Sequence, residues 1–236
     1  MLDFDHFEAL TFDCYGTLID WEAGIVSTLG PILAQHGHEL PREALLERYA
    51  RLEADAEQGP FVNYKTILRR VLDGFGHELG FTPTDAERAA FAGAVRHWPP
   101  FADSPSALRA LQSRYRLVIL SNIDDDLFAH SARHLGIDFD AVITAEQLGS
   151  YKPSLNNFRR MLERVDRPAD RILHVAQSLY HDIVPAKAMG LSTVWVNRRK
   201  GQEGFGATPP AEAEPDLEVP DLQTLASLAV ANPSSH

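Results

Sequence analysis

The sequence predicts an α/β fold in which a doubly wound, mostly parallel β-sheet carries an inserted bundle of helices. Two patterns lead to this prediction: five short, continuous apolar segments, and a long helical stretch between the first and the second of them. Strands of a parallel sheet that is covered on both faces are apolar throughout rather than alternating. A chain of 236 residues with 44% hydrophobic and 23% charged residues is long and apolar enough to form such a fold.

The predicted strands alternate with helical patterns over most of the chain. The strands are expected at Ala9–Phe12, Leu117–Leu120, Ala141–Thr144, Ile172–Val175 and Thr193–Val196. The accompanying helices are expected at Ser106–Tyr115, Leu127–Leu135, Asn156–Val165 and Ile183–Met189, followed by a loop at 201–215 and a last helix near Leu222–Val230. Because strand, helix and strand follow one another, right-handed crossovers should place helices on both faces of the sheet.

The segment after the first strand carries four helical stripes of apolar residues. The stripes are Ile25, Leu29, Ile32 and Leu33; Leu45, Leu46, Tyr49 and Leu52; Ile67, Leu68, Val71, Leu72 and Phe75; and Ala89, Ala90, Phe91 and Val95. Amphipathic helices of this kind bury their apolar faces on one another. We therefore expect a helical cap at residues 20–98, which returns through a stiff proline link at 98–100, and a core made of 1–19 and 99–236.

Composition narrows the classes of function. A formal net charge of −11 argues against a nucleic-acid binder, because phosphate binding needs clustered Lys and Arg. It does not exclude a small anionic substrate, because salt screens distant charges within about 10 Å. Cys14 is the only cysteine, and the first ten residues resemble neither a signal peptide nor a membrane anchor. We expect a cytoplasmic protein without membrane contact, and the sequence leaves the oligomeric state open, a homodimer included.

Polar residues follow four of the predicted strands. Asp13 ends the first strand, Ser121 and Asn122 follow the second, Lys152 follows the third and Asp182 follows the fourth. Each one has an ordinary explanation: the acids and Ser121-Asn122 as turn or helix caps, and the lysine as a solvated surface residue. Ligands of open α/β sheets, however, bind outside the carboxyl ends of the strands, where all of these side chains should meet.

This ordered set resembles the four motifs of the haloacid dehalogenase superfamily, which are an Asp nucleophile, a Ser or Thr, a Lys and an acidic fourth motif. The resemblance covers nearly the whole chain and includes a cap inserted after the nucleophile. It implies a Rossmann-like core. The string Phe12-Asp13-Cys14-Tyr15-Gly16-Thr17-Leu18 is most similar to the 2-haloacid dehalogenase branch (type II), whose signature is Asp-x-Tyr-Gly-Thr.

Two features of the motifs favour dehalogenation over phosphate transfer. Phosphatases of the superfamily carry a second Asp two residues after the nucleophile, which protonates a poor leaving group, and here that position holds Tyr15. A halide leaves without a proton. Those phosphatases also hold Mg²⁺ with acids of the fourth motif, where this chain has Gln177 and Ser178 and keeps only Asp182. We expect no metal and no other cofactor.

The cap carries the next parallel with this branch. Its members have a cap arginine that helps to abstract the halide, and Arg48 lies at the matching spacing before Leu52-Glu53, with Arg51 as a rival. An exposed arginine on a charged helix is the alternative. The chain departs from the branch at Gln177 and Leu179, where relatives have Ser and Asn, and at Phe158, where they have Tyr. The residues that handle water therefore differ.

The resemblance implies a mechanism in two steps. Asp13, kept anionic by Lys152, attacks C2 of a 2-haloacid and expels halide, with Asn122 orienting the reacting groups. Ser121 and backbone N–H groups bind the substrate carboxylate, and water directed by Asp182 then hydrolyses the ester to a 2-hydroxy acid. The expected substrate-binding residues are Tyr15, Gly16, Thr17, Arg48, Ser178 and His181. A phosphatase of the same fold and a catalytically weak binding protein remain the alternatives.

Overall fold

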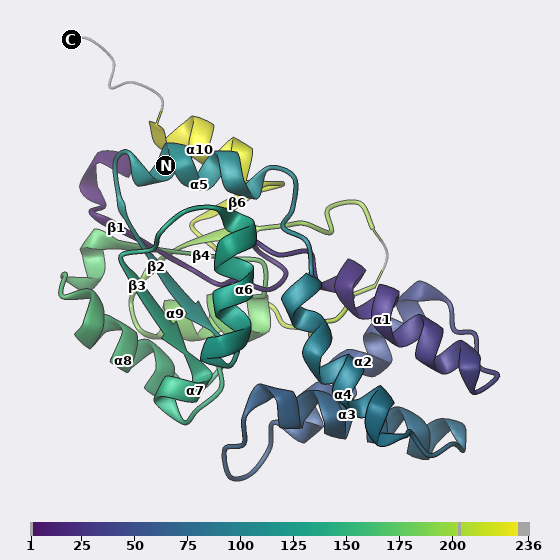
Figure 1. Ribbon diagram of the computed structural model, residues 1–236. Coiled ribbons are helices and arrows are strands. Elements are labelled where there is room, and N and C mark those ends of the chain that lie inside the picture. The colour runs from purple at the N-terminus through teal and green to yellow at the C-terminus, as the bar shows by residue number, and fades with distance from the viewer. Residues whose placement is uncertain (1, 203, 231–236) are drawn as a thin grey trace.

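The computed structural model describes residues 2–202 and 204–230 and contains a parallel β-sheet with helices around it (Figure 1). Its six strands lie in the order β3-β2-β1-β4-β5-β6. Their bounds are Ala9–Phe12 (β1), Arg116–Ser121 (β2), Ala141–Thr144 (β3), Ile172–Ala176 (β4), Ser192–Val196 (β5) and Leu217–Val219 (β6). The α/β prediction is confirmed. The sequence missed β6, because three residues at a sheet edge make too short a pattern to detect.

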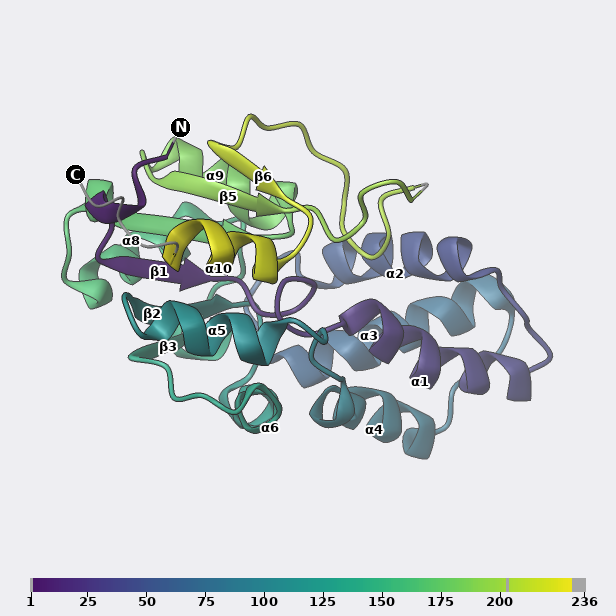
Figure 2. The same ribbon diagram turned by 90° about the horizontal axis from the view of Figure 1, so that it is seen from above.

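Helices cover both faces of the sheet (Figure 2). One layer consists of α5 (Ser104–Gln112), α6 (Asp125–Leu135) and α10 (Leu222–Val230), and the other of α8 (Leu155–Val165) and α9 (Val184–Ala188). Alternate residues of β1 divide between the layers, with Leu10 and Phe12 in one apolar cluster and Ala9 in the other. Coverage on both faces is the physical reason for the continuous apolar strands.

Between β1 and α5 the chain forms a group of helices beside the sheet (Figure 1). They are α1 (Trp21–Gln35), α2 (Arg42–Ala56), α3 (Tyr64–Leu79), α4 (Asp85–Gly93) and the short 3₁₀ helix η2 (Ala94–His97). Residues 20–98 are all described, and none of them belongs to a strand. The outgoing and returning segments pair where Asp20 N–H donates to the Pro99 carbonyl at 2.8 Å. On this basis we propose 20–98 as the cap.

Local signals fix the ends of these helices. Asp20 accepts from the Ala23 N–H at the start of α1, Asn63 accepts from Thr66 at the start of α3, and Thr84 begins α4 with a capping box. Each side-chain oxygen satisfies an N–H that has no partner within its helix. No helix in the described part of the chain has the length and apolar character of a membrane span.

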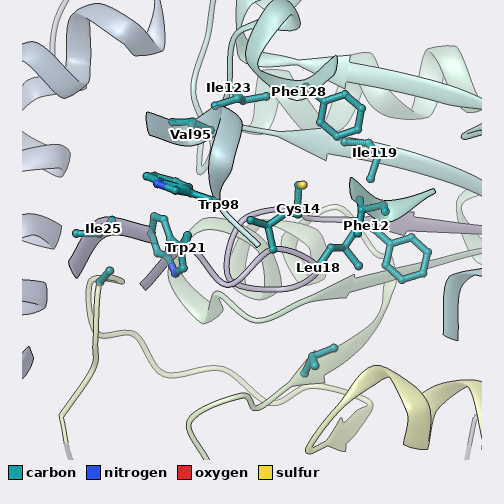
Figure 3. Close-up of a cluster of buried hydrophobic side chains, with 14 of the residues drawn as sticks. Phe12, Cys14, Leu18, Trp21, Ile25, Val95, Trp98, Ile119, Ile123 and Phe128 are labelled. Atoms are coloured by element: carbon teal, nitrogen blue, oxygen red, sulfur yellow. The ribbon is translucent and has the colours of Figure 1, made fainter. Parts of the chain in front are cut away.

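Apolar side chains join the cap to the core. Trp21 and Ile25 of α1 belong to the same buried cluster as Trp98, Cys14 and Phe12, and Figure 3 shows these side chains at the junction. Because the core and cap share one apolar cluster, their packing is coupled.

Gly24 on α1 is required for this junction. A Cβ atom there would lie 2.2 Å from Trp98 Cδ1, so we expect Gly24→Ala to lower the free energy of unfolding by about 1–3 kcal/mol through overpacking. Gly30 on the same helix has no atom within 4 Å of its built Cβ, and Gly30→Ala serves as the matched control. Urea unfolding of both variants checks this, and equal stability of the two would contradict it.

Candidate active site

Side chains from three strand ends meet around the Lys152 ammonium. Lys152 Nζ lies 2.9 Å from Asp13 Oδ1 and 2.7 Å from Asp182 Oδ1, and it also donates to the Leu120 carbonyl at 3.0 Å. The Lys152 and Asp182 side chains are each 1% exposed and that of Asp13 is 8% exposed. The structure thus brings together three of the strand-end residues that the sequence singled out.

Asp13, Lys152 and Asp182 affect one another's ionisation. Burial opposes ionisation of Asp182, but Lys152 and His174 outweigh it and lower the pKa of Asp182. Burial likewise disfavours the charged form of Lys152, yet its two carboxylate partners raise its pKa. For Asp13, burial dominates and raises the pKa, while Lys152 and a hydrogen bond from Thr17 act against this rise. Lys152 is therefore the group that favours an anionic Asp13.

Thr17 and Gly16 shape the loop that carries Asp13. The Thr17 hydroxyl donates to Asp13 Oδ2 at 2.6 Å and accepts from the Gln177 N–H at 2.8 Å, so it orients the carboxylate and is not itself part of the cavity lining. Gly16 has φ +91°, a conformation that side-chain-bearing residues rarely adopt. Both residues lie beside the site as supports for Asp13.

Asn122 and Ser121 differ in what they contact. Asn122 Nδ2 donates to the Lys152 carbonyl at 2.9 Å, and Asn122 Oδ1 accepts from the Lys152 N–H at 2.7 Å, which ties the loops after β2 and β3 together. The Ser121 hydroxyl is buried and, among the described residues, has no hydrogen-bond partner, although Ser121 lines the cavity at Asp13. Its free hydroxyl is a candidate donor to a ligand.

His174 is a polar residue of the site that the sequence analysis missed. It lies inside β4, with Nδ1 2.8 Å from the Thr11 hydroxyl and Nε2 3.0 Å from Asp182 Oδ1. If Thr11 donates to Nδ1, the Nε2–H donates to Asp182 and fixes that carboxylate, whose Oδ2 is buried and has no partner among the described residues. The signal was present in the sequence, since Thr11 and His174 interrupt two apolar strands at facing positions.

The fourth motif begins with a helical turn of unusual geometry. The prediction of a helix from Ile183 to Met189 placed its start late, because a π-helix spans Leu179–Ile183 and α9 follows it. The Ser178 hydroxyl accepts from the His181 N–H at 2.9 Å and lies 3.1 Å from His181 Nδ1. Burial lowers the pKa of His181 to about 4, so its imidazole is neutral at pH 7. Both Ser178 and His181 line the cavity.

The cavity lies between the strand ends and the cap. Its lining consists of Asp13, Tyr15, Trp21, Glu53, Glu57, Tyr64, Ser121, Asn122, Lys152, Ser178, His181, Asp182 and Thr208. The Tyr15 hydroxyl hydrogen-bonds Ser131 at 2.8 Å, and burial raises the pKa of Tyr15 well above its usual value. Tyr15 is therefore a neutral phenol that is ill suited to replace a carboxylic acid as proton donor.

Arg48 lies elsewhere. Its Nε is 3.3 Å from Glu78 Oε2 on α3, and Arg51 binds the same carboxylate at 2.6 Å. Neither arginine is among the described residues that line the cavity. A role for Arg48 in halide binding stays a prediction, and it requires Arg48 to leave Glu78.

A divalent metal fits this donor set poorly. The Lys152 ammonium contacts one oxygen of Asp13 and one of Asp182, and Thr17 donates to the remaining oxygen of Asp13. Within residues 2–202 and 204–230, no cluster of three or more His, Cys, Asp or Glu side chains is arranged to hold a metal ion. Mg²⁺ prefers several hard oxygen ligands in octahedral geometry, and this site offers few of them.

Comparison with known proteins identifies the family of this fold and site. Residues 7–190 match the family model described as haloacid dehalogenase-like hydrolase. The chain belongs to this family. It is 26% identical to an (S)-2-haloacid dehalogenase of Pseudomonas sp. (strain YL), with 95% of each chain covered.

Two further relatives show the range of the family. A crystal structure of an L-2-haloacid dehalogenase superposes with a TM-score of 0.80 at 27% identity, covering 96% of this chain and 100% of that one. The 5-amino-6-(5-phospho-D-ribitylamino)uracil phosphatase YigB of Escherichia coli (strain K12) is 27% identical, with 93% of this chain and 95% of that one covered. The sequence resemblance to the haloacid dehalogenase superfamily is confirmed, and the chain is a hydrolase of this family.

Proposed function

We propose that this hydrolase converts 2-haloalkanoic acids to 2-hydroxy acids and halide through a covalent ester on Asp13. The observation that carries the proposal is the pairing of Asp13 with a buried Lys152, beside a Tyr15 whose hydroxyl is held by Ser131. A carboxylate with a cationic neighbour, and with a tyrosine where the superfamily's phosphatases carry their acid, suits displacement of a group that leaves as a stable anion. Carbon–halogen cleavage fits this better than cleavage of an ester that needs protonation.

In the first step, Asp13 displaces the halide. A carboxylate oxygen of Asp13 bonds to C2, and the electron pair of the carbon–halogen bond leaves with the halide. The Ser121 hydroxyl, which is buried and has no partner among the described residues, donates to the substrate carboxylate together with backbone N–H groups near Tyr15. The Gly16 N–H already donates to the Ile19 carbonyl at 2.8 Å. Lys152 supports this step by favouring the ionised nucleophile.

In the second step, water hydrolyses the ester. Water attacks the acyl carbon of Asp13, and the bond from that carbon to the C2 oxygen breaks. One proton of the water passes to that oxygen, so the 2-hydroxy acid departs and the Asp13 carboxylate is restored. Asp182 orients the water through Oδ2, which has no partner among the described residues, and accepts the other proton of the water, while His174 holds Asp182 Oδ1 in place. Ser178 and the neutral His181 lie along the same wall as further partners for the water.

A phosphatase is the second candidate because of the similarity to the Escherichia coli phosphatase. It requires a proton donor for the leaving alkoxide, and Tyr15 is a poor one because its pKa is raised and its hydroxyl is bound to Ser131. The donor set around Asp13 also fits Mg²⁺ poorly. These observations favour dehalogenation.

A paired substrate panel tests the proposal. Halide release from 2-haloalkanoic acids is measured beside phosphate release from phosphate esters, each with Mg²⁺ and with EDTA. We expect halide release that survives EDTA, because no step uses a metal. Phosphate release that depends strictly on Mg²⁺, without any halide release, would return the protein to the phosphatase class.

A further inference from the structure

The α2 side of the cavity has an acidic wall. Glu53 and Glu57, one helical turn apart at the end of α2, both line the cavity that contains Asp13. Glu53 Oε1 accepts from the Tyr49 hydroxyl at 2.8 Å and from the Tyr64 hydroxyl at 2.5 Å. Among the described residues, no side chain forms a hydrogen bond or an ion pair with the Glu57 carboxyl group. Two tyrosine hydroxyls therefore hold the Glu53 carboxyl group in place, whereas the Glu57 carboxyl group is available to a ligand.

Within the described part of the chain, no cation forms an ion pair with Glu53 or Glu57. Lys152 is the one lysine or arginine among the described residues of the lining, and it already binds Asp13 and Asp182. Arg48 and Arg51 of the same helix bind Glu78 instead. Glu53 is buried and Glu57 is half-buried. Burial of a carboxylate without a paired cation disfavours its ionised form, and a bound cation favours that form again.

The pKa shifts of Glu53 and Glu57 agree with the lack of a paired cation. Burial raises the pKa of Glu53 to about 7, against the hydrogen bonds from Tyr64 and Tyr49. Burial and the neighbouring Glu53 charge raise the pKa of Glu57 well above its usual value, although the Lys152 charge acts against this rise. A bound cation supplies the charge that a proton otherwise supplies.

Two further features point to a ligand with two polar ends. Trp21 and Tyr64 line the cavity beside the acidic wall, and aromatic faces attract organic cations. Ser121 is 2% exposed and lines the same cavity. Its hydroxyl has no hydrogen-bond partner among the described residues. Ser121 is suited to an anionic group near Asp13, and the α2 wall is suited to a cationic group.

We propose that the substrate carries an ammonium group that binds at Glu53 and Glu57 while its halogen-bearing carbon faces Asp13. The substrate class is then an amino-substituted 2-haloalkanoic acid. The reactive half of this statement rests on the proposed dehalogenation. The ammonium site rests on the α2 wall, the aromatic side chains beside it and the unpartnered Ser121 hydroxyl among the described lining residues.

A pair of substrates of equal size tests the ammonium site. 4-Amino-2-chlorobutanoate and 2-chloropentanoate differ by an ammonium group in place of a methyl group. We expect kcat/KM for halide release, corrected for the rate without enzyme, to favour the amino acid by about tenfold or more. The preference should be lost in Glu57→Gln and kept in Glu47→Gln, an exposed residue of the same helix. Equal or better turnover of 2-chloropentanoate by the wild type overturns the proposal.

Binding of the corresponding products separates the two proposals. By calorimetry, 4-amino-2-hydroxybutanoate should bind about tenfold more tightly than 2-hydroxypentanoate, and Glu57→Gln should abolish the difference. This preference without halide release from any acid would refute the dehalogenation and retain the ammonium site. Halide release without a preference in binding or turnover would refute the ammonium site and retain the dehalogenation.

Discussion

Replacement of Asp13 by Asn is expected to lower halide release about 10⁴-fold or more, as loss of a covalent nucleophile does in other hydrolases. A neutral amide cannot displace halide, and it also leaves the Lys152 ammonium with Asp182 as its one remaining carboxylate partner. The measurement is kcat for halide release from 2-haloalkanoic acids. Asp138→Asn, the same change at an exposed position, is the control and should retain wild-type turnover.

Isotope labelling distinguishes a covalent ester from direct attack by water. A single turnover in H₂¹⁸O should leave the product unlabelled and place the label in Asp13, because water attacks the acyl carbon of the ester. Mass spectrometry of the peptide that contains Asp13 detects the label. Label in the product after one turnover, with none in Asp13, would show direct attack and end the covalent proposal.

Replacement of Lys152 by Met is expected to lower the free energy of unfolding by about 3–5 kcal/mol, because it leaves two buried carboxylates without their cation. Lys187→Met is the matched control, since Lys187 pairs with Asp216 at 2.8 Å on the surface. An exposed pair contributes about 1 kcal/mol or less. Urea unfolding at pH 7 compares the two variants, and a similar loss in both would contradict a special role for Lys152.

The pH dependence follows from the direction of the pKa shifts. The pKa of Asp182 is lowered from 3.8, so its stabilising contribution is complete above that value and is lost as the pH falls through the lower folded-state pKa. The pKa of Lys152 is raised from 10.5, so its contribution is complete below that value and is lost as the pH rises through the higher folded-state pKa. Neutral pH lies inside this window.

The same substitution should move the pH profile of catalysis. Without Lys152, only the hydrogen bond from Thr17 is left among the groups that oppose the effect of burial on Asp13, whose pKa then rises further. We expect the acid limb of kcat/KM in Lys152→Met to shift to higher pH, beyond any loss of folded protein. An unshifted acid limb would mean that Lys152 does not control the ionisation of the nucleophile.

The sequence predicted those parts of the site that depend on where a residue lies relative to its own strand. Asp13, Lys152 and Asp182 come after strands and Ser121 ends one. Parallel strands bring their carboxyl ends to one edge, so the approach of these residues to one another was predictable. The strands themselves were predictable because burial on both faces requires continuous apolar runs. The edge strand β6 was not predicted, because three residues are too few to show a periodicity.

The positions of the cap side chains relative to the cavity could not be predicted from local sequence patterns. The resemblance placed Arg48 at the cavity, with an exposed arginine as the alternative. The structure pairs Arg48 with Glu78 on a different helix, and Glu53 and Glu57 line the cavity that contains Asp13. Glu53 follows Leu46, Tyr49 and Ala50 on the buried stripe of α2, which was the available signal for a buried acid. Which residue of that stripe meets the strand ends depends on how the helix is rotated and docked.

By itself the sequence determined the parallel sheet, the insertion of a helical segment and the identity of the groups at the strand ends, because these depend on periodicity and chain order. Tertiary structure alone decided which face of α2 lines the cavity, that His174 holds Asp182, and that Lys152 contacts Asp182 as well as Asp13. The reason is physical: these contacts join residues far apart in the chain, and their distances are set by packing between elements rather than by any local pattern.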